Sequence, residues 1–213
     1  VHSPDPTTPF SETMDALYEL QKQGKIKEIG VSNVDLKELK KYNKDGKVKF
    51  IQNRFSLINR SINKELEQYL LENKIGLIPY QVIDRGQLTG SVIEGVKLRE
   101  GDLRIGRPDW ESEKYNFIAN WSKKNLFPIA KKCDITLGQI SVAWALHQPY
   151  LSFVIVGVTT PEYIPINLKA DSISLSQDTL KEIDKAYALL EREIKDKYNQ
   201  SVREFRGLNE KYY

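Results

Sequence analysis

The segment GKIKEIGVSN, residues 24–33, carries one strand of the fold together with both of its ends. Gly24 ends the preceding amphipathic helix, because glycine readily adopts the left-handed conformation that follows a helix. The apolar and β-branched residues in the range 26–31 predict a short strand, and Ser32 and Asn33 give that strand a polar end. A helix followed directly by a strand indicates an α/β fold, in which the two kinds of element alternate.

The same alternation extends in both directions along the chain. Five strands are predicted, at residues 1–2, 26–31, 48–55, 75–80 and 151–158. Helical segments separate them, and strands joined by helical crossovers run parallel. Two architectures fit this order: an open doubly wound sheet, and the later part of a (β/α)8 barrel, which is typically about 250 residues long. The chain begins within a predicted strand, which favours a barrel with about three further units upstream.

The whole chain, residues 1–213, is predicted to form a single domain. Residues 91–120 are polar, aromatic and irregular, so we expect a long loop there. Residues 176–213 are expected to form a C-terminal helix and tail, with Ser176 as the cap of the helix. An incomplete barrel would leave two sheet edges unpaired. We therefore expect either a longer parent chain or self-association with a complementing fragment or a second copy.

The composition argues against several classes of protein. A net charge of +3 without a long basic run is not typical of a nucleic-acid binder. No segment reaches the roughly 20 apolar residues of a membrane helix, and no N-terminal stretch has the pattern of a signal peptide. The single cysteine, Cys133, indicates a reducing compartment, so we expect the cytoplasm. His2 and His147 lie far apart in the sequence, and no metal site is expected.

Polar or aromatic residues follow the predicted strands at their carboxyl ends, where α/β folds place their sites. They are His2, Ser32–Asn33, Gln52–Asn53, Tyr80–Gln81 and Gly157–Thr159. Solvated loops also begin with polar residues, so this pattern alone leaves a structural and a functional interpretation open. No GxGxxG or P-loop motif follows a strand, so the sequence does not support a Rossmann or P-loop nucleotide site.

Five segments together resemble the aldo-keto reductase family. They are VHSPDP (1–6), GKIKEIGVSN (24–33), IQNRFSLINR (51–60), LIPYQVIDRGQLTG (77–90) and VGVTTPEYIPINL (156–168), in the family's order and at its separations. The resemblance implies a (β/α)8 TIM barrel, of which this chain would hold about five of the eight strands. It also implies NAD(P)H-dependent reduction of an aldehyde or ketone to an alcohol, with NADP as the expected cofactor and NAD as the alternative.

The resemblance implies roles for individual residues. His2 would be the catalytic residue in this chain and would hydrogen-bond the substrate carbonyl. Ser32, Asn33 and Gln52 would bind the nicotinamide carboxamide, and Tyr80 would stack on the nicotinamide ring. The remaining cofactor-binding residues would be Gln81, Val82, Ile83, Arg85, Gly86 and Leu88 in a loop over the pyrophosphate, and Gly157, Val158, Thr159, Tyr163 and Asn167 on the adenosine side.

Other features leave the activity open. The family's catalytic tyrosine, lysine and aspartate match no residue of this sequence, so the chain alone is expected to be inert. One alternative is a cofactor-binding regulatory barrel that senses redox state, like the potassium-channel β subunits, and another is a remnant that binds nothing. Thr159 or Thr160 stands where the family often has Arg or Lys against the 2′-phosphate, so NADP and NAD both stay open. The expected substrate is a small carbonyl compound that the sequence does not identify.

Overall fold

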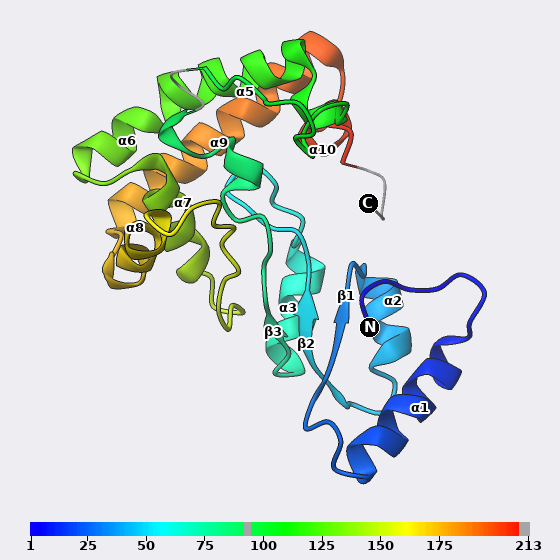
Figure 1. The fold of residues 1–213 in the computed structure, drawn as a ribbon. Coiled ribbons are helices and arrows are strands. Elements are labelled where there is room, and N and C mark those ends of the chain that lie inside the picture. Colours follow the sequence, from blue (N-terminus) through cyan, green and yellow to red (C-terminus); the bar gives the residue numbers. More distant parts are fainter. Residues whose placement is uncertain (92–94, 209–213) are drawn as a thin grey trace.

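The computed structural model describes residues 1–91 and 95–208 (Figure 1). Its strands are β1 (Ile29–Ser32), β2 (Val48–Gln52) and β3 (Gly76–Leu77). Its α-helices are α1 (Phe10–Lys22), α2 (Leu36–Tyr42), α3 (Lys64–Glu72), α5 (Ser112–Asn125), α6 (Phe127–Lys132), α7 (Leu137–Leu146), α8 (Tyr163–Leu168), α9 (Gln177–Tyr198) and α10 (Val202–Phe205). Its 3-10 helices are η1 (Asp84–Gly86), η2 (Pro108–Trp110) and η3 (Lys169–Ser172).

The three strands form one parallel sheet in the order β1-β2-β3. Each strand pairs with the next one in the chain, with Ser32 opposite Gln52 and Ile51 opposite Leu77. The crossovers are α2 and α3, as the alternation of elements predicted. A sequential order without a switch point is the order of a barrel wall, whereas a doubly wound sheet reverses its order at the switch point. The carboxyl ends of the strands therefore meet along one edge.

The sheet lies between two groups of helices (Figure 1). In that view α1 and α2 lie to the right of the sheet and α3 overlaps β2 and β3, whereas α5, α6, α7, α9 and α10 gather above. Ile51 and Leu77 of the sheet are fully buried, as are Ile140 of α7 and Ile183 and Leu190 of α9. All five belong to one contiguous apolar cluster. The positions of the strand ends therefore depend on the packing of the later helices.

Two of the five predicted strands are not strands in the structure. Residues 1–2 and 151–158 have only isolated backbone pairing to their neighbours. Ser32 N donates to the carbonyl of Val1 at 2.8 Å, and Ile155 N donates to the carbonyl of Pro79 at 3.0 Å. A strand requires a regular ladder of such bonds, and these are too few and too unevenly spaced. β3 is also shorter than predicted, although Ile78 N and Tyr80 N still donate to the carbonyls of Ile51 and Asn53, at 2.8 and 3.2 Å.

The prediction of an irregular loop over residues 91–120 is wrong for its last part. α5 begins at Ser112 and buries Ile118 and Trp121, which lie three positions apart on one face. The prediction failed because no side chain caps the start of this helix, so the sequence has no boundary signal there. Residues 95–107 are irregular as expected, and residues 92–94 lie outside the described part of the chain.

The C-terminal helix begins where the sequence predicted. Ser176 caps α9, accepting a hydrogen bond from Thr179 N at 3.1 Å. After α9, Ser201 and Glu204 form a capping box that starts α10. This second helix directs Arg206 back into the interior, where its side chain is fully buried. The tail beyond residue 208 lies outside the described residues.

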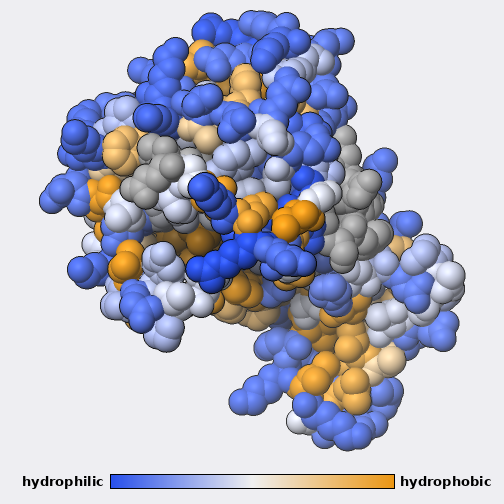
Figure 2. Space-filling view, turned by 45° about the horizontal axis from the view of Figure 1, so that its top comes forward, coloured by the Kyte–Doolittle hydropathy of each residue, from blue (hydrophilic) through white to orange (hydrophobic). Residues whose placement is uncertain are grey.

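Apolar side chains also reach the surface. Figure 2 shows them near the middle of one face and toward its lower right. In the described ranges, large exposed apolar side chains are concentrated in residues 153–168, and they are Phe153, Ile155, Val158, Tyr163, Ile164, Ile166 and Leu168. Within residues 1–91 and 95–208, no helix combines the length and the apolar character needed to span a membrane.

Candidate cofactor site

The carboxyl ends of β1 and β2 are fastened together by hydrogen bonds. Ser32 Oγ donates to the carbonyl of Gln52 at 2.6 Å, and Asn33 N donates to the same carbonyl at 3.1 Å. The buried side chain of Asn53 binds both backbone groups of Val34, with Oδ1 accepting from its N–H at 3.2 Å and Nδ2 donating to its carbonyl at 2.7 Å. These bonds hold Asn33 in the left-handed region, at φ 58°. They place the side chain of Asn33 at the edge of the sheet.

Tyr80 and His2 complete this edge. The hydroxyl of Tyr80 donates to Asn33 Oδ1 at 2.6 Å, and Asn33 Nδ2 donates to the backbone carbonyl of His2 at 2.9 Å. The structure therefore brings together three groups that the sequence only placed at strand ends. His2 takes part through its carbonyl, and the residue is exposed. The ring of Tyr80 is half-buried, and its hydroxyl is fixed by Asn33.

Buried side chains and internal backbone hydrogen bonds hold the loop that follows Tyr80. Val82 and Leu88 are fully buried, and Ile83 is half-buried against the core. Several loop N–H groups are bonded to loop carbonyls, including Gly86 N to Ile83 O at 2.9 Å and Leu88 N to Ile83 O at 3.2 Å. Arg85 points inward, and its Nη1 lies 3.1 Å from Asp109 Oδ2. The proposed contact of Arg85 with phosphate stays a prediction.

A buried group of ion pairs lies beneath this loop, and sequence reasoning missed it. Asp84 is fully buried and binds two arginines, Arg54 at 2.6 Å and Arg206 at 2.8 Å. Ser56 Oγ donates to the second carboxylate oxygen of Asp84 at 2.9 Å. Asp109 also accepts from Arg54, at 3.0 Å. We call Arg54, Asp84, Asp109 and Arg206 the buried ion cluster.

Acid is expected to weaken the fold through Asp84. Burial alone would raise the pKa of Asp84, but the attraction of Arg206 and Arg54 and their hydrogen bonds outweigh burial and hold that pKa well below its usual value. A lowered folded-state pKa gives a stabilisation that is complete above the unfolded pKa of about 3.9 and is lost as the pH falls toward the folded value. We therefore expect the free energy of unfolding, measured with urea, to fall more steeply below pH 4 in the unaltered chain than in Asp84→Asn.

The exposed pair of Arg60 and Asp184, 2.7 Å apart, provides the control for this experiment. Asp184→Asn is expected to keep the pH dependence of the unaltered chain, because solvent screens a pair in which Asp184 is 60% exposed. Equal pH dependence in Asp84→Asn and in the unaltered chain would contradict the role given to Asp84.

The predicted adenosine-side residues form a separate, exposed group. Gly157, Val158, Thr159 and Tyr163 are exposed, and Asn167 in α8 is half-buried. A Cβ added at Gly157 would meet no atom within 4 Å. The bond from Ile155 N to Pro79 O places this segment next to the residue that precedes Tyr80. In the described ranges, no three His, Cys, Asp or Glu side chains are grouped to hold a metal ion.

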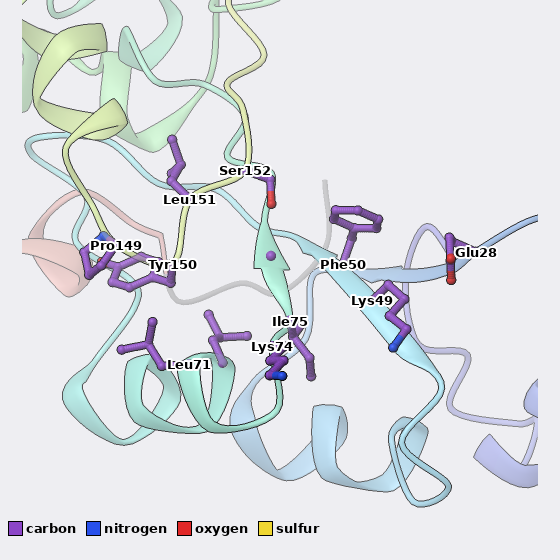
Figure 3. Close-up of a pocket in the computed structure, with 12 residues that line it drawn as sticks. Glu28, Lys49, Phe50, Leu71, Lys74, Ile75, Pro149, Tyr150, Leu151 and Ser152 are labelled. Carbon is purple, nitrogen blue, oxygen red and sulfur yellow. The ribbon is translucent and has the colours of Figure 1, made fainter.

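A hollow lies at the other end of the sheet (Figure 3). It has a volume of about 360 Å³, and its lining includes Glu28, Lys49, Gly76 and Ser152. Gly76 is the first residue of β3 and Glu28 immediately precedes β1, so the hollow faces the amino-terminal ends of the strands. Parallel α/β barrels use that end for stability and the opposite end for chemistry. This hollow is therefore not the candidate site.

Comparison with known proteins identifies related sequences. The model of the Aldo/keto reductase family matches residues 1–188. The chain is 29% identical over 173 residues to the NADH-specific methylglyoxal reductase of Escherichia coli (strain K12), which covers 79% of this chain and 51% of that protein. It is 30% identical over 190 residues to the aldo-keto reductase yakc [NADP(+)] of Schizosaccharomyces pombe, covering 87% and 55%. The chain thus spans about half the length of the curated relatives it matches.

Two solved structures are similar to this chain in fold. The glycerol dehydrogenase of Gluconobacter oxydans superposes with a TM-score of 0.79 at 24% identity, over 88% of this chain and 57% of that one. A thermostable aldo-keto reductase in complex with the inhibitor epalrestat gives a TM-score of 0.65 at 27% identity, over 87% and 58%. These neighbours indicate an α/β TIM-barrel fold, of which this structure shows a three-stranded parallel sheet.

Proposed function

Since the chain belongs to the aldo/keto reductase family, we propose that it binds a nicotinamide dinucleotide at the edge formed by Ser32, Asn33, Gln52 and Tyr80. The reaction proposed for the protein is the reduction of a small aldehyde or ketone to an alcohol. Bound nicotinamide would supply the hydride. Turnover is proposed only for a protein that also carries the tyrosine, lysine and aspartate implied by the family resemblance.

The observation that carries this proposal is the bond between Tyr80 and Asn33. It holds an aromatic ring at the mouth of the sheet beside an amide, at 2.6 Å from hydroxyl to Asn33 Oδ1. An aromatic face buries a flat heterocycle, and side-chain amides supply the donor and the acceptor that a carboxamide needs. Ser32 and Gln52 lie directly beside Asn33 in the paired strands. The grouping suits the nicotinamide end of the cofactor.

Two further features fit a ligand at this edge. Gln81 Oε1 is buried and has no hydrogen-bond partner among the described residues. Buried polar atoms are rarely left unpaired unless a ligand or water satisfies them. Gly157 is open to solvent, and an added side chain there would enter space that the protein does not fill. Gln81 and Gly157 would both lie along the extended dinucleotide, with Gln81 nearer the nicotinamide and Gly157 nearer the adenosine.

Of the two nicotinamide dinucleotides, NADP(H) is the one that we propose as the cofactor. Thr159 and Thr160 are exposed ahead of α8, where their hydroxyls can donate to a 2′-phosphate. They supply no charge, and the two relatives described above are named for NADH and for NADP(+), so NADH is the direct competitor. His2 is proposed to hydrogen-bond the substrate carbonyl, and the exposure of the residue leaves its ring accessible. The proposed location is the cytoplasm, which suits the free thiol of Cys133.

Replacing Tyr80 tests the site directly. Tyr80→Ala is expected to raise the Kd of NADPH by about ten- to a hundredfold, because stacking of a base on an aromatic side chain contributes about 1–3 kcal/mol. Tyr80→Phe keeps the ring and loses the bond to Asn33, so a smaller increase of roughly two- to tenfold is expected. The measurement is a titration of NADPH fluorescence, repeated with NADH.

Tyr69→Phe is the matched control for this titration. Tyr69 lies on α3 and its hydroxyl accepts from Asn43 Nδ2 at 3.2 Å, and Asn43 bonds Val48 at the amino-terminal end of β2, away from the carboxyl ends of the strands. No change in Kd is expected for it. If Tyr80→Ala bound both cofactors as the unaltered chain does, the nicotinamide assignment would be wrong. The regulatory alternative has no specific observation in its favour and is not proposed.

A further inference from the structure

The loop after Tyr80 has a strained backbone. Gln81, Asp84 and Arg85 have φ of 57°, 50° and 54°. These values lie in the left-handed region, which residues other than glycine rarely adopt. Asp84 and Arg85 are consecutive, which makes this short segment more demanding than an isolated turn residue. Such conformations persist where the surrounding structure fixes them, and they concentrate at ligand clamps and functional sites.

The buried ion cluster fixes this loop from three directions. Asp84 of the loop binds Arg54, which follows β2, and Arg206, which follows α10. From the third direction, Asp109 of η2 binds Arg85 of the loop at 3.1 Å. Each contact joins the loop to a segment far from it in the sequence, and Asp84 and Arg206 are 122 positions apart. The conformation of the loop is thus set by groups outside it.

Gln87 strengthens the same arrangement. Its Nε2 donates to the backbone carbonyl of Asp109 at 2.6 Å, and its Oε1 accepts from Arg206 Nη2 at 3.1 Å. Gln87 and Arg206 are fully buried, and Asp109 is 2% exposed. Buried ion pairs favour one geometry over its alternatives, because another arrangement leaves a buried charge without its partner.

We propose that the buried ion cluster holds residues 81–90 in the conformation that receives the cofactor, so that Asp84, Arg206 and Arg85 are positioning residues. This inference rests on the proposed function. Arg85 acts by anchoring the loop to Asp109, and the C-terminal segment after α9 contributes to cofactor binding through Arg206. A loop that is ordered before binding has less conformational entropy to lose when the ligand arrives. Weakening the cluster therefore weakens binding without removing any group that touches the cofactor.

The test combines hydrogen exchange with cofactor titration. The variant is Asp84→Asn with Arg206→Gln, which removes both charges and leaves two amides that can pair. In the full chain without cofactor, peptides covering 81–90 are expected to exchange about tenfold faster than in the unaltered chain, since a loop with fewer fixed contacts opens more often. Peptides of α9 should keep their exchange rate. The Kd of NADPH is expected to rise about tenfold.

Two control variants separate this effect from a general loss of stability. Lys132→Gln with Glu182→Gln removes an exposed ion pair of 2.6 Å between α6 and α9. Ile183→Val alters a fully buried core residue of α9 without touching the loop. Both are expected to leave the exchange of 81–90 and the Kd of NADPH unchanged. Should the double variant fail to fold, Gln87→Met replaces it, because it removes the bonds to Arg206 and to the Asp109 carbonyl without removing a charge, and it has the same two expected readouts.

The outcomes distinguish the two proposals. Unchanged exchange of 81–90 in a folded variant, or faster exchange with an unchanged Kd, would overturn the positioning role alone. Absence of NADPH and NADH binding by the unaltered chain would overturn the proposed function and with it the cofactor role of the cluster. Faster exchange together with a raised Kd, in the cluster variant and not in the controls, would support the inference.

Discussion

Replacing Phe55 by alanine is expected to lower the free energy of unfolding by about 3–5 kcal/mol, the range typical of large aromatic deletions in a core. Phe55 is 1% exposed. Its ring stacks on Trp144 of α7, with centroids 5.2 Å apart and planes at 20°, and meets the edge of Tyr150 at 6.3 Å. Urea unfolding followed by tryptophan fluorescence measures the loss, because the stacking on Trp144 is one of the contacts removed.

The size of this effect follows from where Phe55 lies. It follows β2 by three residues, and its N–H donates to the carbonyl of Tyr80 at 3.3 Å. The ring therefore connects the site edge of the sheet to α7, so its removal opens a cavity between two layers. Phe127→Ala in α6 is the control: Phe127 is 40% exposed, and a loss below about 1 kcal/mol is expected. A loss below about 1 kcal/mol in Phe55→Ala, no larger than that of the control, would contradict the role given to Phe55.

The parts of the fold that sequence reasoning recovered are those with local signals. β1 and β2 stand out because apolar runs end in polar pairs, and α9 because Ser176 caps it. Three of the predicted strand ends, at His2, Asn33 and Tyr80, are joined by hydrogen bonds, and parallel strands in sequential order bring their carboxyl ends to one edge. Tyr80 and Asn33 were each named as candidates, but the bond between them could not be read from the sequence because it joins residues 47 positions apart.

Other parts depend on partners that the local sequence does not reveal. The apolar run at 151–158 has the composition of a strand, yet strand formation depends on a paired neighbour more than on composition. The buried ion cluster is a stronger case. Arg54 lies beside the polar strand end of β2, and Arg206 lies in the C-terminal tail, so each has the appearance of a solvated charge. Only the fold brings both to Asp84, where they are almost completely buried.

Replacing Arg206 by alanine is expected to cost about 3–5 kcal/mol of stability, the range for removing one partner of a buried ion pair. Arg206 is fully buried and donates to Asp84 Oδ2 at 2.8 Å and to Gln87 Oε1 at 3.1 Å. Without it, the Asp84 carboxylate keeps Arg54 and Ser56 as partners but loses its second cation. Urea unfolding at pH 7 measures the loss, with Arg203→Ala as the control, because Arg203 is exposed and lies on α10, the short helix that Arg206 follows.

A double-mutant cycle separates the ion pair from the lost packing of the long side chain. Asp84→Ala, Arg206→Ala and the combined variant are compared, and a coupling free energy of about 1–3 kcal/mol is expected for residues in direct contact. The combined variant should be less destabilised than the sum of the single changes, because it does not leave one buried charge facing a missing partner. Additive losses would show that Arg206 stabilises the chain by filling space. In that case the C-terminal segment would have no electrostatic connection to the loop that follows Tyr80.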